Sequence, residues 1–144
     1  KEVMDGVVGG TIGGTYCGNA VACASGMALL DVMMKEDYPA KAMKIAERCM
    51  SKFNQWKEKY EVVGDVRGVG AMMGVEFVKN KDTKEPNSEI VTAIVNAAVQ
   101  KGLLLEGAGT YNNVIRFLCP LCVTDEQLEA GLAIYEEVLD ELAK

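Results

Sequence analysis

Apolar residues recur at helical spacing in three separate segments of this chain, with charged residues between them. One stripe begins near Pro39, whose fixed φ suits the first turn of a helix, and continues to Trp56. A second runs from about Ser88 to Lys101 and stops at Gly102, where a left-handed C-cap is expected. We predict a helix for each. The positions of the first stripe that should face a core are Ala42, Ile45, Ala46, Cys49, Met50, Phe53 and Trp56.

The third stripe follows Thr124, which precedes Gln127 by the spacing of a capping box. Its predicted buried positions are Leu128, Leu132, Ile134, Tyr135, Val138, Leu139 and Leu142. The segment Ala20–Met34 differs from all three stripes because it is apolar on nearly every side. Such a segment indicates a helix that is buried on more than one face.

Other segments indicate strands, and in one of them the apolar residues recur at every second position, which is the spacing of a strand, instead of at helical spacing. In Ala71–Val78 every second residue is apolar, so we predict a long strand with one covered face, entered through a turn at Gly64–Gly70. Leu103–Leu105 is predicted as a strand, Gly107–Asn113 as a loop and Val114–Leu118 as the antiparallel returning strand. The predicted fold class is α+β, a small antiparallel sheet packed against helices.

Composition narrows the classes of partner. The chain has 144 residues, 49% of them hydrophobic and 25% charged, which suits one ordinary core. Its 15 basic and 21 acidic residues give a net charge of −6 without a basic cluster, so we expect small-molecule or protein ligands and neither nucleic acid nor membrane. The chain shows no signal-peptide pattern, which favours the cytoplasm, and Lys1 in place of Met is compatible with a start inside a longer polypeptide.

Histidine is absent, which removes the usual general base and the commonest metal ligand. The five cysteines include one Cys-x-x-Cys, Cys119 to Cys122, but no second pair stands by to complete a zinc site. We therefore expect no metal and interpret the cysteines as reduced thiols in packed segments of a cytoplasmic protein.

The segment Gly13–Asn19 is a glycine-rich turn that leads directly into an apolar helix. The backbone at Gly14 can pass close to a ligand, the Thr15 hydroxyl can donate to a phosphate oxygen, and a helix start adds free N–H groups. Neither the P-loop nor the dinucleotide fingerprint is present. The alternative is a tight turn before a buried helix, which spacing alone favours.

Arg116 interrupts an apolar strand beside a glycine-rich loop, where an arginine is a rigid, planar clamp for a carboxylate. The alternative is that it points to solvent or pairs with a carboxylate such as Glu106. Arg67 is a second candidate anion binder, although pairing with Asp65 to fix its turn is the stronger interpretation. Glu76 is either a base or a salt-bridge partner, and nothing around it in the sequence favours the base.

Three motifs together resemble the class III pyridoxal-phosphate aminotransferases, and within that class the 4-aminobutyrate aminotransferases. The motifs are Gly13–Asn19, Asp65–Met72 and Gly109–Arg116, the last followed by Pro120-Leu121. The resemblance covers essentially the whole chain. It implies the C-terminal part of a fold type I enzyme: residues 1–35 would be the end of the large cofactor domain and residues 36–144 the small domain.

The resemblance also implies roles for single residues. Gly14 and Thr15 match the turn that reaches the phosphate of pyridoxal 5'-phosphate in the neighbouring subunit, which implies a homodimer, and Arg116 matches the arginine that binds the substrate carboxylate. The Schiff-base lysine of the family lies upstream, so no catalytic residue is expected here and the segment alone should be inactive without the N-terminal large domain. The implied substrates are small amino acids and keto acids: 4-aminobutyrate or a similar omega-amino acid as donor and 2-oxoglutarate as acceptor.

Two alternatives stay open. An acetylornithine or ornithine aminotransferase, or another member of the class, shares these motifs in similar form. A free-standing α+β module that binds a small molecule or another subunit without chemistry is the alternative from a different functional class.

Overall fold

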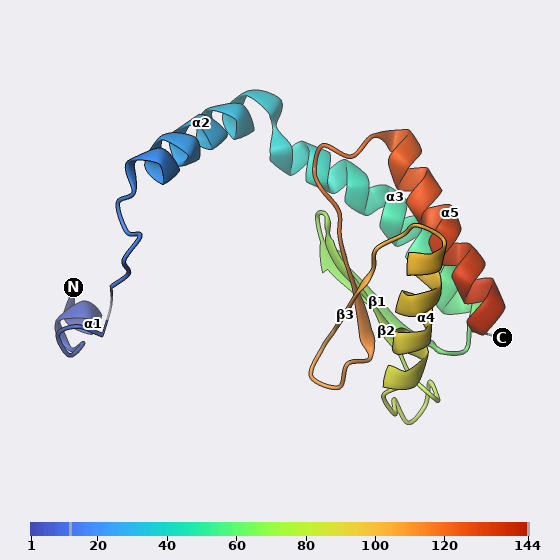
Figure 1. Cartoon of the computed structure of the whole chain (residues 1–144). Coiled ribbons are helices and arrows are strands. Elements are labelled where there is room, and N and C mark those ends of the chain that lie inside the picture. Colours follow the sequence, from blue (N-terminus) through green and yellow to red (C-terminus); the bar gives the residue numbers. More distant parts are fainter. Residues whose placement is uncertain (12, 144) are drawn as a thin grey trace. The chain divides into compact units, whose positions relative to one another are not determined.

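The computed structural model describes residues 1–11 and 13–143, and these form two compact units, Lys1–Asp37 and Tyr38–Lys144. The first unit holds α1 (Glu2–Asp5) and α2 (Ala20–Glu36) (Figure 1). The side chain of Asn19 caps α2 by accepting a hydrogen bond from the Ala22 amide at 3.0 Å. The predicted helix is present, but the prediction of burial is wrong for this chain. No side chain of α2 is buried, because its own unit offers only the four-residue α1 to cover it.

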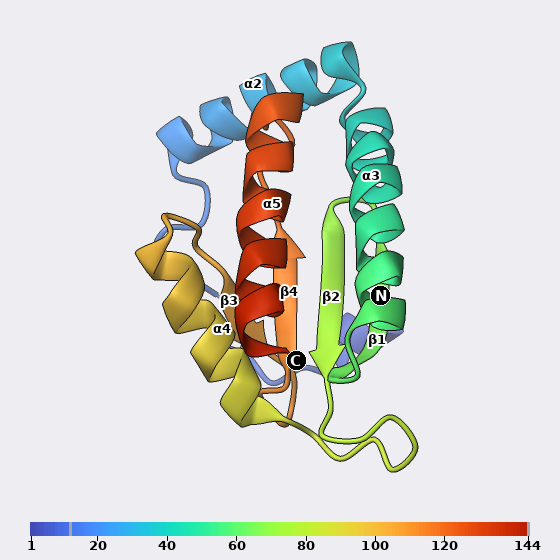
Figure 2. The same cartoon turned by 90° about the vertical axis from the view of Figure 1, so that its right-hand side faces the viewer.

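The second unit is a four-stranded antiparallel sheet with three helices against it. The strand order is β1-β2-β4-β3, with β1 (Val63–Val69), β2 (Met72–Phe77), β3 (Glu106–Ala108) and β4 (Val114–Leu118). The helices α3 (Tyr38–Lys59), α4 (Ser88–Gln100) and α5 (Asp125–Leu142) all lie on one face of this sheet (Figures 1 and 2). The predicted α+β class with a small antiparallel sheet is confirmed.

The core lies between the sheet and these helices and is built around aromatic rings. The Phe53 and Trp56 rings on α3 are 5.1 Å apart, Tyr135 on α5 stands 4.8 Å from Trp56, and Phe117 on β4 stands 5.5 Å from Phe53. The contacts of Tyr135 with Trp56 and of Phe117 with Phe53 are edge-on, and such contacts add to the burial of large apolar surfaces. Most predicted positions of the helical stripes thus face the core, but Ala46 and Ile134 are only half-buried and Leu142 is exposed.

The N-terminus of α5 has the predicted capping box, and the C-terminus of α4 is followed by the predicted left-handed glycine. The Thr124 side chain accepts from the Gln127 amide while the Gln127 side chain accepts from the Thr124 amide, which completes the capping box. Helix α4 ends at Gln100, and Gly102 beyond it has a φ of +85°. Within residues 1–11 and 13–143, none of the helices combines the length and apolar character that crossing a bilayer needs.

Two strand predictions need correction. The segment predicted as a turn at Gly64–Gly70 is largely strand β1, because it pairs along its length with β2 and buries Val63 and Val66. Leu103–Leu105 is not a strand: the strand is Glu106–Ala108, so it starts one residue after the end of the predicted strand and extends two residues into the predicted loop, and Glu106 pairs directly with Arg116. In β2 the predicted alternation is confirmed, since Met73, Val75 and Phe77 are buried.

Candidate functional site

The face of the sheet away from the helices, called here the open face, brings two arginines into one cross-strand row. The strand registers pair Arg67 with Gly74, Gly74 with Arg116, and Arg116 with Glu106. Directly paired residues point to the same side of a sheet, and successive residues point to opposite sides. Since Ile115 and Phe117 on either side of Arg116 are buried, the Arg116 row faces away from the core.

The guanidinium of Arg116 forms an ion pair through one nitrogen, whereas another of its nitrogens has no hydrogen-bond partner among the described residues. Its Nη2 donates to a carboxylate oxygen of Glu106, which is the ion pair that the sequence offered as an alternative to a substrate clamp. The side chains keep 40% and 66% of their surface exposed, respectively, so solvent reaches the pair. The Nε of Arg116 is buried and has no hydrogen-bond partner in the described part of the chain. A buried donor without an acceptor is costly, so the guanidinium of Arg116 is incompletely satisfied.

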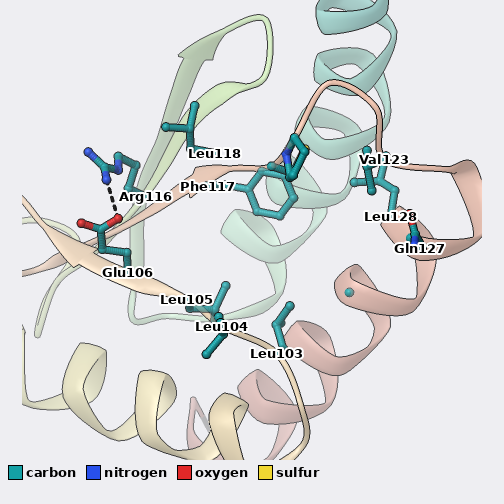
Figure 3. Close-up of a pocket in the computed structure, with 13 residues that line it drawn as sticks. Leu103, Leu104, Leu105, Glu106, Arg116, Phe117, Leu118, Val123, Gln127 and Leu128 are labelled. Atoms are coloured by element: carbon teal, nitrogen blue, oxygen red, sulfur yellow. Dashed lines mark hydrogen bonds and ion pairs between the residues drawn. The ribbon is translucent and has the colours of Figure 1, made fainter. Parts of the chain in front are cut away.

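A pocket of about 380 Å³ opens beside this arginine (Figure 3). Figure 3 shows Arg116 and Glu106 at one side of it and Val123, Gln127 and Leu128 at the other. It exists because β3 starts only at Glu106, so the chain before it does not pair with the end of β4. The apolar residues lining it are Leu103, Leu104, Leu105, Phe117, Leu118, Pro120, Val123 and Leu128.

Arg67 has a different environment, because two carboxylates engage its Nη1. Its Nη1 lies 2.6 Å from Glu76 and 3.0 Å from Asp65, and these contacts raise the pKa of the guanidinium. Burial pushes the pKa of Asp65 up, but hydrogen bonds from Lys57 and Arg67 outweigh it and hold that pKa below its ordinary value. The predicted pairing of Arg67 with Asp65 is thus present, and Glu76 is a salt-bridge partner.

Gly14 and Thr15 lie in the other compact unit. The Gly14 carbonyl accepts a hydrogen bond from the Cys17 amide at 3.1 Å, which closes a turn in which Thr15 is exposed. A Cβ at Gly14 would stand 3.1 Å from the sulfur of Cys17, so this exposed side chain would have to shift slightly to admit it. The turn therefore presents the Thr15 hydroxyl just ahead of the N-terminus of α2.

The cysteines divide into two groups. Cys49 is buried in the core, and burial together with the nearby Cys119 and Glu129 raises the pKa of its thiol to about 12. Burial also raises the pKa of Cys119. Cys17, Cys23 and Cys122 are exposed, which corrects the expectation that all five lie in packed segments; all five carry free thiols. The exposed ones belong to α2, to the turn before it and to the loop before α5, where no core covers them.

Sequence reasoning missed one member of the Arg116 row, Gly74, and the pocket. Gly74 drew no attention because a glycine in an alternating strand carries no chemical signal, and Glu106 was named only as an alternative partner for Arg116. The pocket was hidden because three consecutive leucines are typical of a strand.

A family profile and two curated relatives that match this chain all belong to the aminotransferases. The sequence profile described as "Aminotransferase class-III" matches residues 1–139. The chain is 44% identical to the 5-aminovalerate aminotransferase of Pseudomonas aeruginosa over 99% of its length and 33% of that protein. It is 40% identical to a probable 4-aminobutyrate aminotransferase of Bacillus subtilis, over 94% of its length and 31% of that protein.

The fold comparison agrees with the sequence comparison. An amine transaminase from an uncultivated Pseudomonas species, solved in its PLP-bound form, matches with a TM-score of 0.81 and 29% identity, over 92% of this chain and 30% of the other. The chain thus spans about a third of the length of the proteins that it matches.

Proposed function

Because the chain belongs to the class III aminotransferase family, we propose that it forms the C-terminal part of a pyridoxal-phosphate-dependent aminotransferase. In this proposal residues 1–35 complete the large cofactor domain and residues 36–144 form the small domain. The observation that carries it is Arg116, fixed on a strand, with an incompletely satisfied guanidinium and a solvent-accessible ion pair to Glu106 beside which a ligand can bind. Similar relatives about three times as long support the view that the complete enzyme contains an upstream large domain.

Gly14 and Thr15 are proposed to hold the cofactor phosphate. The donor set fits that group, because a hydroxyl and the amides of a turn ahead of a 17-residue helix are the groups that bind phosphate oxygens well. When bound, pyridoxal phosphate supplies the electron sink that stabilises a carbanion at the substrate carbon. Thr15 would donate its hydroxyl hydrogen to a phosphate oxygen. In line with the family resemblance, we propose that this phosphate lies in the neighbouring subunit of a homodimer.

Arg116 is proposed to bind the carboxylate of the amino or keto acid. A guanidinium on a strand has little freedom to turn, so a two-point contact fixes the orientation of the carbon that must lose its proton. The relatives named for 5-aminovalerate and 4-aminobutyrate support an omega-amino acid as amine donor. We propose 2-oxoglutarate as the acceptor.

The lysine that takes and returns the proton is proposed to lie upstream of Thr15, outside this sequence. The chain by itself should therefore bind or orient ligands without turning them over. The cytoplasm is the proposed compartment, on the basis of an odd number of free thiols.

Replacing Thr15 by alanine should weaken binding of pyridoxal phosphate to the complete enzyme by about tenfold or more, because one hydrogen bond to a charged oxygen is lost. Thr11→Ala is the matched control: it removes a hydroxyl from the same unit, one that donates to the Val8 carbonyl at 2.6 Å. Cofactor affinity is measured by titrating the apoenzyme and following absorbance. Equal affinities for the two variants would return Thr15 to the role of a turn residue.

The proposed function is tested with the visible spectrum of the complete, cofactor-loaded enzyme, before and after 5-aminovalerate or 4-aminobutyrate is added without a keto acid. Conversion of the cofactor from its aldehyde to its amine form supports both the class and the donor. Conversion only by acetylornithine or ornithine keeps the class and changes the donor. Failure to bind the cofactor would overturn the assignment in favour of a non-catalytic binding module.

A further inference from the structure

The ion-pair partner of Arg116, Glu106, is the second charged group beside the proposed carboxylate site. Glu106 stands directly opposite Arg116 on β3, which is the edge strand of the sheet in the described part of the chain. Its carboxylate is two-thirds exposed and engages a single atom of the guanidinium, Nη2. An ion pair this accessible to water is weakly held, so a ligand can approach the same arginine without breaking a buried contact.

The opposite flank of Arg116 carries no side chain, because its partner there is Gly74. A Cβ at Gly74 would stand 3.1 Å from Val114 Cγ1, so even the smallest side chain would crowd the neighbouring strand. A ligand carboxylate can therefore reach the guanidinium over Gly74 while Glu106 remains on the other side.

Each arginine of the open face is paired with at least one carboxylate, and at Arg116 that carboxylate is Glu106. Across Gly74, Arg67 is engaged by Glu76 and Asp65, and Asp65 also pairs with Lys57 at 3.0 Å. Three positive and three negative groups thus share the open face and its rim. An anion at Arg116 is attracted by the guanidinium and repelled by Glu106, and the repulsion grows with the charge of the anion.

We propose that Glu106 is a specificity-determining residue that lowers the preference of the enzyme for keto acids with two carboxylates relative to those with one. The inference rests on the proposed function, in which Arg116 binds the keto acid. With Glu106 in place the site offers a nearly neutral pair instead of a net positive charge. A dianion such as 2-oxoglutarate loses more attraction from that neutralisation than a monoanion such as pyruvate does.

The test compares kcat/KM for 2-oxoglutarate and for pyruvate in the complete enzyme and its Glu106→Gln variant. Glutamine keeps the shape and removes the charge. The ratio of the two kcat/KM values should rise about two- to fivefold in favour of 2-oxoglutarate, the scale of an exposed ion pair. Glu61→Gln is the matched control, because its side chain is 90% exposed and lies outside the Arg116 row while the net charge changes equally.

Salt separates an electrostatic role from a structural one. The difference between wild type and Glu106→Gln should shrink at high NaCl, because screening shortens the reach of the missing charge. An unchanged ratio, a shift toward pyruvate, or the same shift in Glu61→Gln would overturn the inference. Wild-type enzyme that transfers no amino group to either acceptor would instead contradict the proposed function, so the two failures are distinct.

Discussion

Replacing Arg116 by alanine should raise the KM for 2-oxoglutarate by about thirty- to a hundredfold while leaving the cofactor content unchanged. The change removes the charged donors that we propose bind the substrate carboxylate, and hydrogen bonds to a charged group are worth about 1.5–3 kcal/mol. It also leaves Glu106 on the open face without its cation, which adds repulsion toward an anion. Steady-state kinetics with varied keto acid, and absorbance of the bound cofactor, measure the two quantities separately.

Arg116→Lys is the informative companion. A lysine keeps the positive charge but presents a point charge instead of a planar fork, so KM should fall between the values for wild type and alanine. Equal losses of cofactor content and keto-acid affinity in Arg116→Ala would contradict the assignment of Arg116 to the substrate, since such a result would indicate a general disturbance of the fold.

Gly68→Ala is expected to destabilise the protein by about 3 kcal/mol or more, the scale of severe overpacking against backbone. A Cβ at Gly68 would stand 2.4 Å from the Met72 carbonyl oxygen and 2.6 Å from the Met73 Cα. Both atoms belong to the paired strand β2, which cannot retreat without losing its register with β1. Urea unfolding followed by circular dichroism measures the loss.

Gly131→Ala is the control for this substitution. Gly131 lies inside α5, and its added Cβ would meet only Leu103 Cδ1 at 3.6 Å, an ordinary contact. Alanine is a better helix former than glycine by about 1 kcal/mol, so stability should stay equal or rise. If both variants unfold at the same urea concentration as wild type, the close approach of β1 and β2 at Gly68 does not limit stability.

The helices were predictable because their signals are local. Thr124 and Gln127 are three residues apart, and their reciprocal hydrogen bonds need nothing from the rest of the fold. The alternation of Met73, Val75 and Phe77 was equally clear, because a strand with one covered face has a period of two.

The strands at the two edges of the sheet were not predictable in the same way. β1 carries glycines that are typical of a turn, yet Gly64 and Gly68 are needed because Val78 and the β2 backbone pass too close for a side chain. β3 is set by its pairing with β4, and the hydrophobicity of Leu103–Leu105 pointed to the wrong residues. Arg116 was found because a charge inside an apolar strand is unusual. Its partner was ambiguous because register depends on tertiary structure.

The strand order β1-β2-β4-β3 also determines when the site can assemble during folding. The hairpin of β1 and β2 closes through a two-residue turn between Val69 and Met72, so it places Arg67, Glu76 and Asp65 together early. Pairing Gly74 with Arg116 joins residues about forty positions apart, and such a closure costs more chain entropy and forms more slowly. A chain arrested at the hairpin stage therefore carries the ion pairs of Arg67 but has not yet placed Arg116 beside Gly74.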